Sequence, residues 1–394
     1  MLKLIPAALL ICVFFNSGCQ PSEPKRIAFK KRSDSIKNIS FSQSVKYFEL
    51  DSITGPKVQC LQYVRLKDRD YLAFLNEETG VLYLNDYQTG KIFSRLAIQD
   101  NKRDHRKLFQ GFYYQNPDSI FLFYFGPSVA LVNDKGEIKK RYNLSNKTTQ
   151  TPIEQLIVKG FYSSTSNQGF YEQDTLYLNS VVLGGSKMER KKVQILLNVK
   201  DGNQSFREMD MPLVYRQHNL ANGDFHLYAT SYNPKTKKIV YSFPADENLI
   251  SRNLHDSKQS SFFSGSKHID FMNEYDEKQY KNGISDPMIE HFMTSGSFGS
   301  VLFDKFNNLY YRIGFLPIGK KNLNYEEKNA PLKQLSVIVL DQNFKYLGEI
   351  KLSANQYQMS SAFVSEKGLN IQERPLNDEI LKFTVFKFNT PAIK

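Results

Sequence analysis

Short runs of β-branched and aromatic residues alternate with turn residues along most of the chain, and helical periodicity is scarce. Residues 71–98 contain three such runs, which are separated by two segments that end in Gly80 and Gly90. Apolar runs of this length, joined by turns that end in glycine, predict antiparallel strands in a meander. A second unit of the same kind covers residues 119–144. The pattern therefore predicts an all-β protein.

The unit of strand, Asp or Asn turn and strand recurs along the chain, at residues 195–202, 232–243, 301–312 and 337–346. We interpret the turn aspartates as residues that bond their own backbone, and not as metal ligands. The turns at Asp86 and Asp134 lie 48 residues apart, which is close to the length of a four-stranded propeller blade. Counting from Phe41 to Phe388 gives about 23 candidate strands, or about six blades of four strands.

The sequence therefore predicts a single β-propeller of about six four-stranded blades over residues 41–394. A sandwich would need far fewer strands, and a transmembrane barrel would need longer alternating segments. We expect the strand at residues 45–50 to pair with the C-terminal strand near residues 380–388. This pairing would close the ring and remove the open sheet edges that a radial array of sheets otherwise leaves.

Residues 253–298 interrupt the alternation of strands and turns, because they are polar and lack a clean strand pattern. We interpret this range as a long irregular insert on the surface, and a binding loop on a rigid scaffold is the alternative. Within it, Asp286 as a cap and Pro287 at the first helical position predict a short helix that ends near Met293.

The range Met1–Gly18 has the features of an export signal. Lys3 is the positive residue, and the apolar run of about a dozen residues that follows is too short to span a bilayer. Ser17–Gly18 directly precedes Cys19, which resembles a bacterial lipobox, although Asn16 departs from its usual aliphatic residue. The sequence predicts a lipoprotein signal peptide at residues 1–18 and a lipid anchor on Cys19. Plain secretion or a short anchor helix is the alternative.

Residues 19–40 contain prolines, serines and five Lys or Arg residues between positions 25 and 32. Because no hydrophobic periodicity runs through them, we expect a basic flexible tether without a packed element. Solvation of these charges is the favoured interpretation, and contact with anionic lipid headgroups is the alternative. An exported chain seldom meets nucleic acid, so we expect no nucleic-acid partner.

Charge and cysteine content fit this organisation. The 394 residues carry a formal net charge of +12, and a disproportionate share of it lies in the tether. Of the three cysteines, Cys12 would leave with the signal peptide and Cys19 would carry the lipid. Cys60 then remains as a single buried thiol, so the mature chain has no intramolecular disulfide.

The usual catalytic motifs do not occur in the sequence. The six histidines form no H-E-x-x-H pair, the cysteines lack zinc-ligand spacing, and neither a G-x-S-x-G elbow nor a phosphate-binding loop occurs. We therefore predict no catalytic residue, metal site or cofactor. Arg312 and Tyr311 are the candidate ligand-binding residues, since an arginine near the channel would bind an anionic group. In the alternative, the tyrosines at 310 and 311 pack between blades and Arg312 is an exposed strand residue.

Three segments together resemble a known family: the lipobox-like start, the range 239–250 and the range 300–313. They resemble uncharacterised Bacteroidetes lipoproteins with a TolB-like six-bladed propeller, the domain-of-unknown-function family 4221. The resemblance covers roughly residues 41–388 and implies the fold and an envelope location. The family has no assigned activity, so the resemblance transfers no catalytic residues.

These observations predict a lipid-anchored, non-enzymatic binding or scaffolding module of the cell envelope. Its partners would be the membrane, through Cys19, and an envelope protein, a glycan or a peptide. The alternative is a propeller hydrolase or lyase, which requires a cluster of carboxylates or histidines at the channel. Few acidic residues follow Cys19, and Lys25 and Arg26 come soon after. This favours the periplasmic face of the outer membrane over the cell surface.

Overall fold

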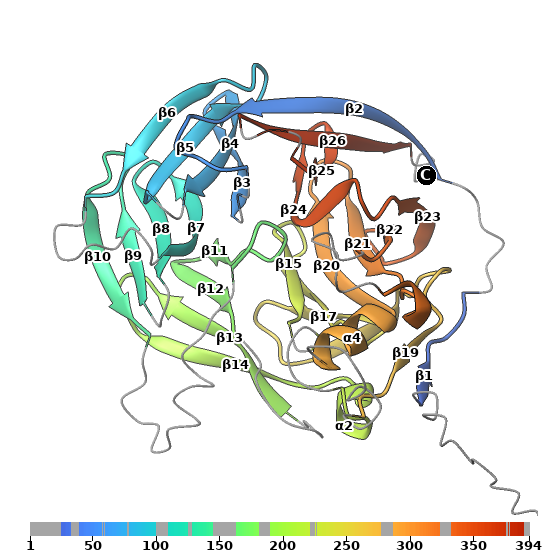
Figure 1. Cartoon of the computed structure of the whole chain (residues 1–394). Coiled ribbons are helices and arrows are strands. Elements are labelled where there is room, and N and C mark those ends of the chain that lie inside the picture. Colours follow the sequence, from blue (N-terminus) through green and yellow to red (C-terminus); the bar gives the residue numbers. More distant parts are fainter. Residues whose placement is uncertain are drawn as a thin grey trace, which may run out of the picture.

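Six four-stranded antiparallel sheets surround a central axis in the part of the chain that the structure describes (Figure 1). The structure is a computed structural model, and the described residues are 25–32, 39–56, 58, 60–76, 79–99, 109–124, 128–144, 163–180, 190–220, 225, 227–276, 287–323, 332–375, 377 and 379–389. The protein is therefore a six-bladed β-propeller, as the repeat pattern predicts.

Five of the six blades are each built from four strands that follow one another in the chain. Blade 1 consists of β3 (Leu61–Leu66), β4 (Arg69–Asn76), β5 (Val81–Asp86) and β6 (Ile92–Ala97), and blade 2 of β7 (Phe109–Asn116), β8 (Ser119–Tyr124), β9 (Ser128–Val132) and β10 (Ile138–Asn143). Blade 3 consists of β11 (Phe170–Glu172), β12 (Thr175–Asn179), β13 (Arg190–Asn198) and β14 (Gln204–Asp210). Blade 4 consists of β15 (Ala229–Asn233), β16 (Lys238–Ser242), β17 (Asn248–Asn253) and β18 (Gln259–Phe263), and blade 5 of β20 (Ser297–Asp304), β21 (Leu309–Phe315), β22 (Leu335–Asp341) and β23 (Tyr346–Leu352).

The hydrophobic core lies between neighbouring blades. In β8, Ile120 and Leu122 pack with residues of blade 1, whereas Phe121 and Phe123 pack with residues of blade 3. Successive side chains of a strand point to opposite faces of its sheet, so a strand between two blades needs apolar residues at every position. This explains the continuous apolar runs in the sequence.

The last blade closes the ring. It contains β24 (Tyr357–Ser365), β25 (Gly368–Glu373), β26 (Ile380–Asn389) and, as its outermost strand, β2 (Ser40–Glu49) from the other end of the chain. β2 runs antiparallel to β26 along its whole length, and Val45 pairs with Thr384. Figure 1 shows the two strands side by side at the edge of the ring. The predicted pairing of residues 45–50 with the C-terminal strand is confirmed.

Residues 253–298 contain more regular structure than the sequence indicates. β18 is the outermost strand of blade 4, and its polar sequence reflects its half-exposed position at the rim. The range also contains β19 (Phe271–Asn273) and helix α4 (Pro287–Thr294). The predicted helix with Pro287 at its first position is confirmed, and Asp286 lies outside the described residues.

The expectation that residues 19–40 contain no packed element is wrong for the range Lys25–Arg32, which we call the N-terminal strap. Its strand β1 (Arg26–Ala28) pairs with β19. Phe29 is buried in the core, and Arg32 is buried with its guanidinium 4.0 Å from the centre of the Tyr346 ring. The strap is ordered because Ile27 and Phe29 alternate with the basic residues and pack against the propeller.

The helical elements of the described residues are short. Besides α4, they include helix α2 (Leu213–Gln217) and the 3-10 helix η2 (Lys320–Asn322). No helix in the described ranges combines the length and the apolar character that crossing a membrane requires.

Candidate functional site

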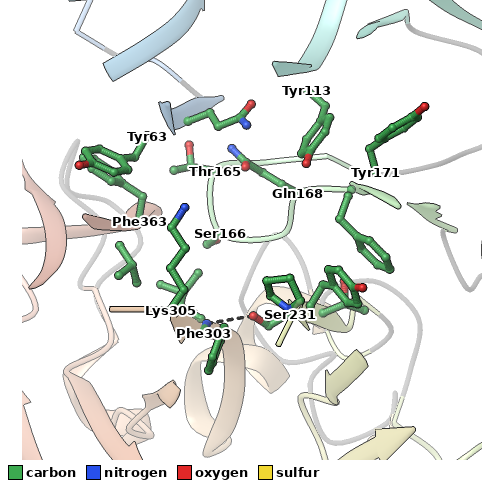
Figure 2. Close-up of a pocket in the computed structure, with 18 of the residues that line it drawn as sticks. Tyr63, Tyr113, Thr165, Ser166, Gln168, Tyr171, Ser231, Phe303, Lys305 and Phe363 are labelled. Carbon is green, nitrogen blue, oxygen red and sulfur yellow. Dashed lines mark hydrogen bonds between the residues drawn. The ribbon is translucent and has the colours of Figure 1, made fainter. Parts of the chain in front are cut away.

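A pocket of about 410 Å³ lies at the centre of the ring. The innermost strand of every blade lines it, namely β3, β7, β11, β15, β20 and β24. Figure 2 shows side chains from these strands converging on it. Aromatic rings form much of its wall, from Tyr63, Tyr113, Phe170, Tyr171, Tyr232, Phe303 and Phe363. A concave site with aromatic walls and a few polar groups is the usual form of a small-molecule site.

The floor of the pocket is the segment before β11, residues 163–169, which we call the plug loop. Its residues Ser163 to Asn167 are all buried, although each has a polar side chain. Thr165 Oγ1 accepts a hydrogen bond of 2.8 Å from the backbone N–H of Leu61 in blade 1. The plug loop lies at the centre of the ring in Figure 1, where no sheet of the propeller reaches.

Asn167 connects the plug loop to blades 3 and 4. Its Oδ1 accepts hydrogen bonds from the Thr230 backbone N–H and from Asn179 Nδ2, both at 2.9 Å. Its Nδ2 donates to the Tyr228 carbonyl oxygen at 3.1 Å. Buried polar groups that are satisfied in this way keep a loop in one conformation. The pocket therefore has a rigid, polar floor.

Glu172 and Lys305 are the two charged residues among those that line the pocket in the described part of the chain. Glu172 forms an ion pair of 2.6 Å with Lys237. Burial disfavours the ionised carboxylate, but the hydrogen bonds from Lys237 and Tyr232 outweigh it and lower the pKa of Glu172. The carboxylate is therefore charged at neutral pH and is neutralised by its partner.

Lys305 follows β20 directly, and its side chain points into the pocket (Figure 2). Its ammonium lies 5.2 Å from the centre of the Phe306 ring. Burial lowers the pKa of Lys305, and the charge of Arg65 lowers it further, while Asp70 opposes them. Asp70 is engaged by Arg65, which donates to its two oxygens at 2.6 and 2.9 Å. No described residue forms a hydrogen bond or an ion pair with the Lys305 ammonium.

Arg312, a predicted ligand-binding residue, lies away from this pocket and is completely buried. Its guanidinium donates to the carbonyl oxygens of Asp246 at 2.6 Å and Glu247 at 2.8 Å, and it lies 4.0 Å from the centre of the Phe298 ring. The position corrects both sequence interpretations, because Arg312 is neither at a channel mouth nor exposed. It fastens blade 5 to blade 4.

Tyr311, the second predicted ligand-binding residue, is also buried. Its hydroxyl donates to Asp304 Oδ2 at 2.8 Å, and its ring packs against Phe388 of the closing blade. Tyr310 packs on the other face of the sheet, against Phe303 and Phe344. The packing alternative is therefore correct for the two tyrosines.

The predicted anchor residue Cys19 lies outside the described residues. Cys60 is a buried free thiol, as expected. Within the described ranges, no three His, Cys, Asp or Glu residues come together in a way that could hold a metal ion. The pocket residues themselves were missed by the sequence analysis, because a turn lysine such as Lys305 has no distinguishing pattern.

The fold and the pocket define a six-bladed propeller with a central pocket, and the comparisons with known proteins agree with this fold. The family model "Domain of unknown function (DUF4221)" matches residues 38–351. The chain belongs to the DUF4221 family.

A crystal structure of a DUF4221 family member from Bacteroides vulgatus shares the fold, with a TM-score of 0.75 and 19% identity over 90% of this chain and 99% of that one. A structure from Bacteroides fragilis gives a TM-score of 0.48 and 11% identity, over 91% of this chain and 99% of that one. BamB from Moraxella catarrhalis gives a TM-score of 0.36 and 7% identity, over 82% of this chain and 74% of that one. No curated protein matches the chain.

Proposed function

We propose that this protein is a lipid-anchored, non-enzymatic binding module of the cell envelope, and that a small ligand occupies the central pocket. The observation that carries this proposal is the pocket itself, which all six innermost strands and the plug loop line. The cavity of about 410 Å³ lies within the size range of small-molecule sites. Its aromatic walls and its hydroxyl and amide groups suit a ring compound better than an extended polymer.

The charges of the pocket favour binding over the hydrolase or lyase alternative. Glycoside hydrolysis uses two carboxylates that flank one bond, whereas Glu172 is the one carboxylate among the lining residues of the described chain. That carboxylate is held in an ion pair with Lys237. The wall also has no histidine or cysteine among these residues to act as a base or a nucleophile.

The binding test uses purified full chain and ligand-observed NMR with small sugars, sugar acids, aromatic acids and short peptides as probes. Gln115 lines the pocket at an exposed position of β7, so Gln115→Trp places an indole in the mouth. Ser260→Trp, on the exposed rim strand β18, is the matched control. Binding that Gln115→Trp abolishes and Ser260→Trp preserves supports the proposal. Equal binding by both variants would place the ligand elsewhere and overturn it.

The anchor is the second part of the proposal and rests on the lipobox-like sequence before Cys19. We propose the periplasmic face of the outer membrane as its location. Lys25 is held beside β19, because its carbonyl oxygen accepts a hydrogen bond from the Glu274 backbone N–H and its ammonium pairs with the Glu274 carboxylate. Five residues separate this point from Cys19. Six Cα–Cα steps reach at most about 20 Å, so the lipid would hold the propeller close to the membrane surface.

The anchor is tested by fractionation of cells that express Cys19→Ser. Loss of the lipid should move the protein from the membrane fraction to the soluble fraction, or leave it unprocessed, because several acyl chains supply the membrane affinity. A Cys60→Ser variant is the control, since Cys60 is buried in the core. A processed Cys19→Ser protein that stays in the membrane would contradict the anchor.

A further inference from the structure

The two charged side chains that line the central pocket differ in their direct partners. Glu172 has its own cation, because Lys237 Nζ lies 2.6 Å from Glu172 Oε1. Lys305 has no such partner in the described chain, and Asp70, whose charge acts on it, accepts two hydrogen bonds from Arg65. A second carboxylate, Glu366, accepts from the same arginine at 2.5 Å. The Lys305 ammonium therefore faces the cavity without a direct hydrogen bond or ion pair to a described residue.

The turn that carries Lys305 is held firmly. Asp304 is completely buried, and its Oδ1 accepts hydrogen bonds from the backbone N–H groups of Phe306 and Asn307 at 2.9 and 3.0 Å. On the other side of Lys305, the Phe303 backbone N–H donates to Ser231 Oγ at 2.9 Å, which ties β20 to blade 4 (Figure 2). The base of the Lys305 side chain is therefore positioned before any ligand arrives, which lowers the entropic cost of binding.

The aromatic walls of the pocket are held in place by ring contacts. Phe170 is stacked between Tyr177 and Tyr232, with ring centres 4.5 and 4.2 Å away. Tyr63 is held edge-on between Tyr87 and Phe306, so its ring orientation is set by packing. Rings that are immobilised by neighbours give the pocket a fixed apolar wall, and the tyrosine hydroxyls add hydrogen-bonding groups.

From the ammonium without a direct partner and the aromatic walls, we infer that the central pocket selects a small organic acid, a ring compound with one carboxylate that the Lys305 ammonium binds. The inference rests on the proposed function, because it names the ligand class of the same site. A charge-assisted contact between an ammonium and a carboxylate is among the stronger hydrogen bonds in proteins. The ammonium has no direct partner in the described chain, so a neutral analogue that lacks a carboxylate forgoes this charge-assisted contact and gains much less on binding.

The test is isothermal titration of the purified full chain with two acids and their neutral counterparts. Glucuronate with glucose tests a hydroxylated ring, and benzoate with benzyl alcohol tests an aromatic ring. Lys305→Met removes the charge, and Lys305→Arg keeps it. Lys235→Met is the matched control, because Lys235 belongs to the neighbouring turn but directs its ammonium to Asn308 Oδ1 at 2.8 Å.

We expect at least one acid to bind at millimolar concentration or better, and about tenfold or more tighter than its neutral counterpart. Lys305→Met should remove this preference, whereas Lys305→Arg and Lys235→Met should keep it. Neutral compounds that bind as well as the acids would overturn the charge selection but leave the proposed binding function intact. An acid preference that survives Lys305→Met, or no binding of either acid, would also overturn the inference.

Discussion

Arg312 provides the sharpest test of how the blades are held together. The side chain leaves β21 in blade 5 and crosses to blade 4, where it donates to Asp246 O, Glu247 O and Ser264 O at 2.6, 2.8 and 3.2 Å. It also donates to Ser242 Oγ at 3.1 Å. Burial lowers the pKa of Arg312 and the nearby acidic residues oppose this, but a guanidinium stays protonated at neutral pH.

The perturbation is Arg312→Met, which retains an unbranched side chain over Phe298 but removes every donor. The carbonyl oxygens of Asp246 and Ser264 then lose this donor, whereas the Glu247 carbonyl oxygen keeps a hydrogen bond of 3.1 Å from the Ser264 backbone N–H. Each unsatisfied buried group costs about 1–3 kcal/mol. Relief from the burial of a charge offsets part of this cost. We expect a net loss of about 2–4 kcal/mol in the free energy of unfolding, because two buried carbonyl groups are left unsatisfied while no buried charge remains.

The assay is urea denaturation followed by circular dichroism, with Arg252→Met as the matched control. Arg252 also donates to a backbone carbonyl, Glu208 O at 2.9 Å, but it is partly exposed. Water can replace its contacts, so the control should lose less than about 1 kcal/mol. The reasoning is refuted if both variants unfold at the same urea concentration, or if Arg312→Met unfolds like the wild type.

Three further predictions follow from the closing blade and the buried histidine. Deleting residues 381–394 removes most of β26 between β2 and β25, so the melting temperature should fall sharply, and an unchanged melt would contradict ring closure. Gly90→Ala should lower the free energy of unfolding by about 1–3 kcal/mol in a urea melt. Gly90 has a φ of +75°, and a Cβ there would collide with the Tyr47 carbonyl oxygen. A variant as stable as the wild type would refute this. Burial, opposed by a 2.7 Å hydrogen bond to Asn273 O, lowers the pKa of His291 from 6.5 to about 4. Between pH 6.5 and about 4, His291 is protonated in the unfolded chain but neutral in the folded chain. The free energy of unfolding should therefore fall by up to about 3 kcal/mol as the pH drops through this range. Urea melts across this range should show a shallower dependence for His291→Phe, and an unaltered slope would contradict the assignment.

Sequence patterns were sufficient to predict those elements whose structure is determined by residues close together in the chain. The continuous apolar strands, the turns that end in Gly80 and Gly90, and the helix that begins at Pro287 all depend on a few adjacent residues. The pairing of β2 with β26 is a long-range contact, but it follows from a general requirement, since an open ring would leave two sheet edges unpaired. The strands, their turns and the closure of the ring could therefore be predicted from the sequence.

The sequence of the strap contains a strand pattern, but its basic composition favoured the prediction of a flexible tether. Ile27 and Phe29 alternate with Arg26 and Ala28, which is the period of a strand with one buried face. The basic composition suggested a solvated tether instead. The guanidinium of Arg32 packs on the rings of Phe263 and Tyr346, so a basic residue here contributes to packing.

The pocket and Arg312 could not be derived from the sequence, because their roles depend on what lies across the ring. Arg312 is buried since the Asp246–Glu247 turn of the neighbouring blade presents carbonyl oxygens to it. The plug loop is a run of Ser, Thr and Asn that is typical of a surface turn, yet it is buried because it bonds to blades 1, 3 and 4 at the centre of the ring. Lys305 becomes distinctive only when the fold places it among the residues that line the central pocket.

The closing strand also determines when the fold can be completed. β2 comes from the start of the propeller sequence, whereas its partner β26 comes from the very end, and Ser40 pairs with Asn389. During synthesis the first five blades can collapse in turn, but the N-terminal strand must wait for a partner that is made last. Contacts between such distant residues make folding slow, and the waiting strand exposes an unpaired edge. A chaperone that shields this edge until the chain is complete would therefore act on β2 before any other strand.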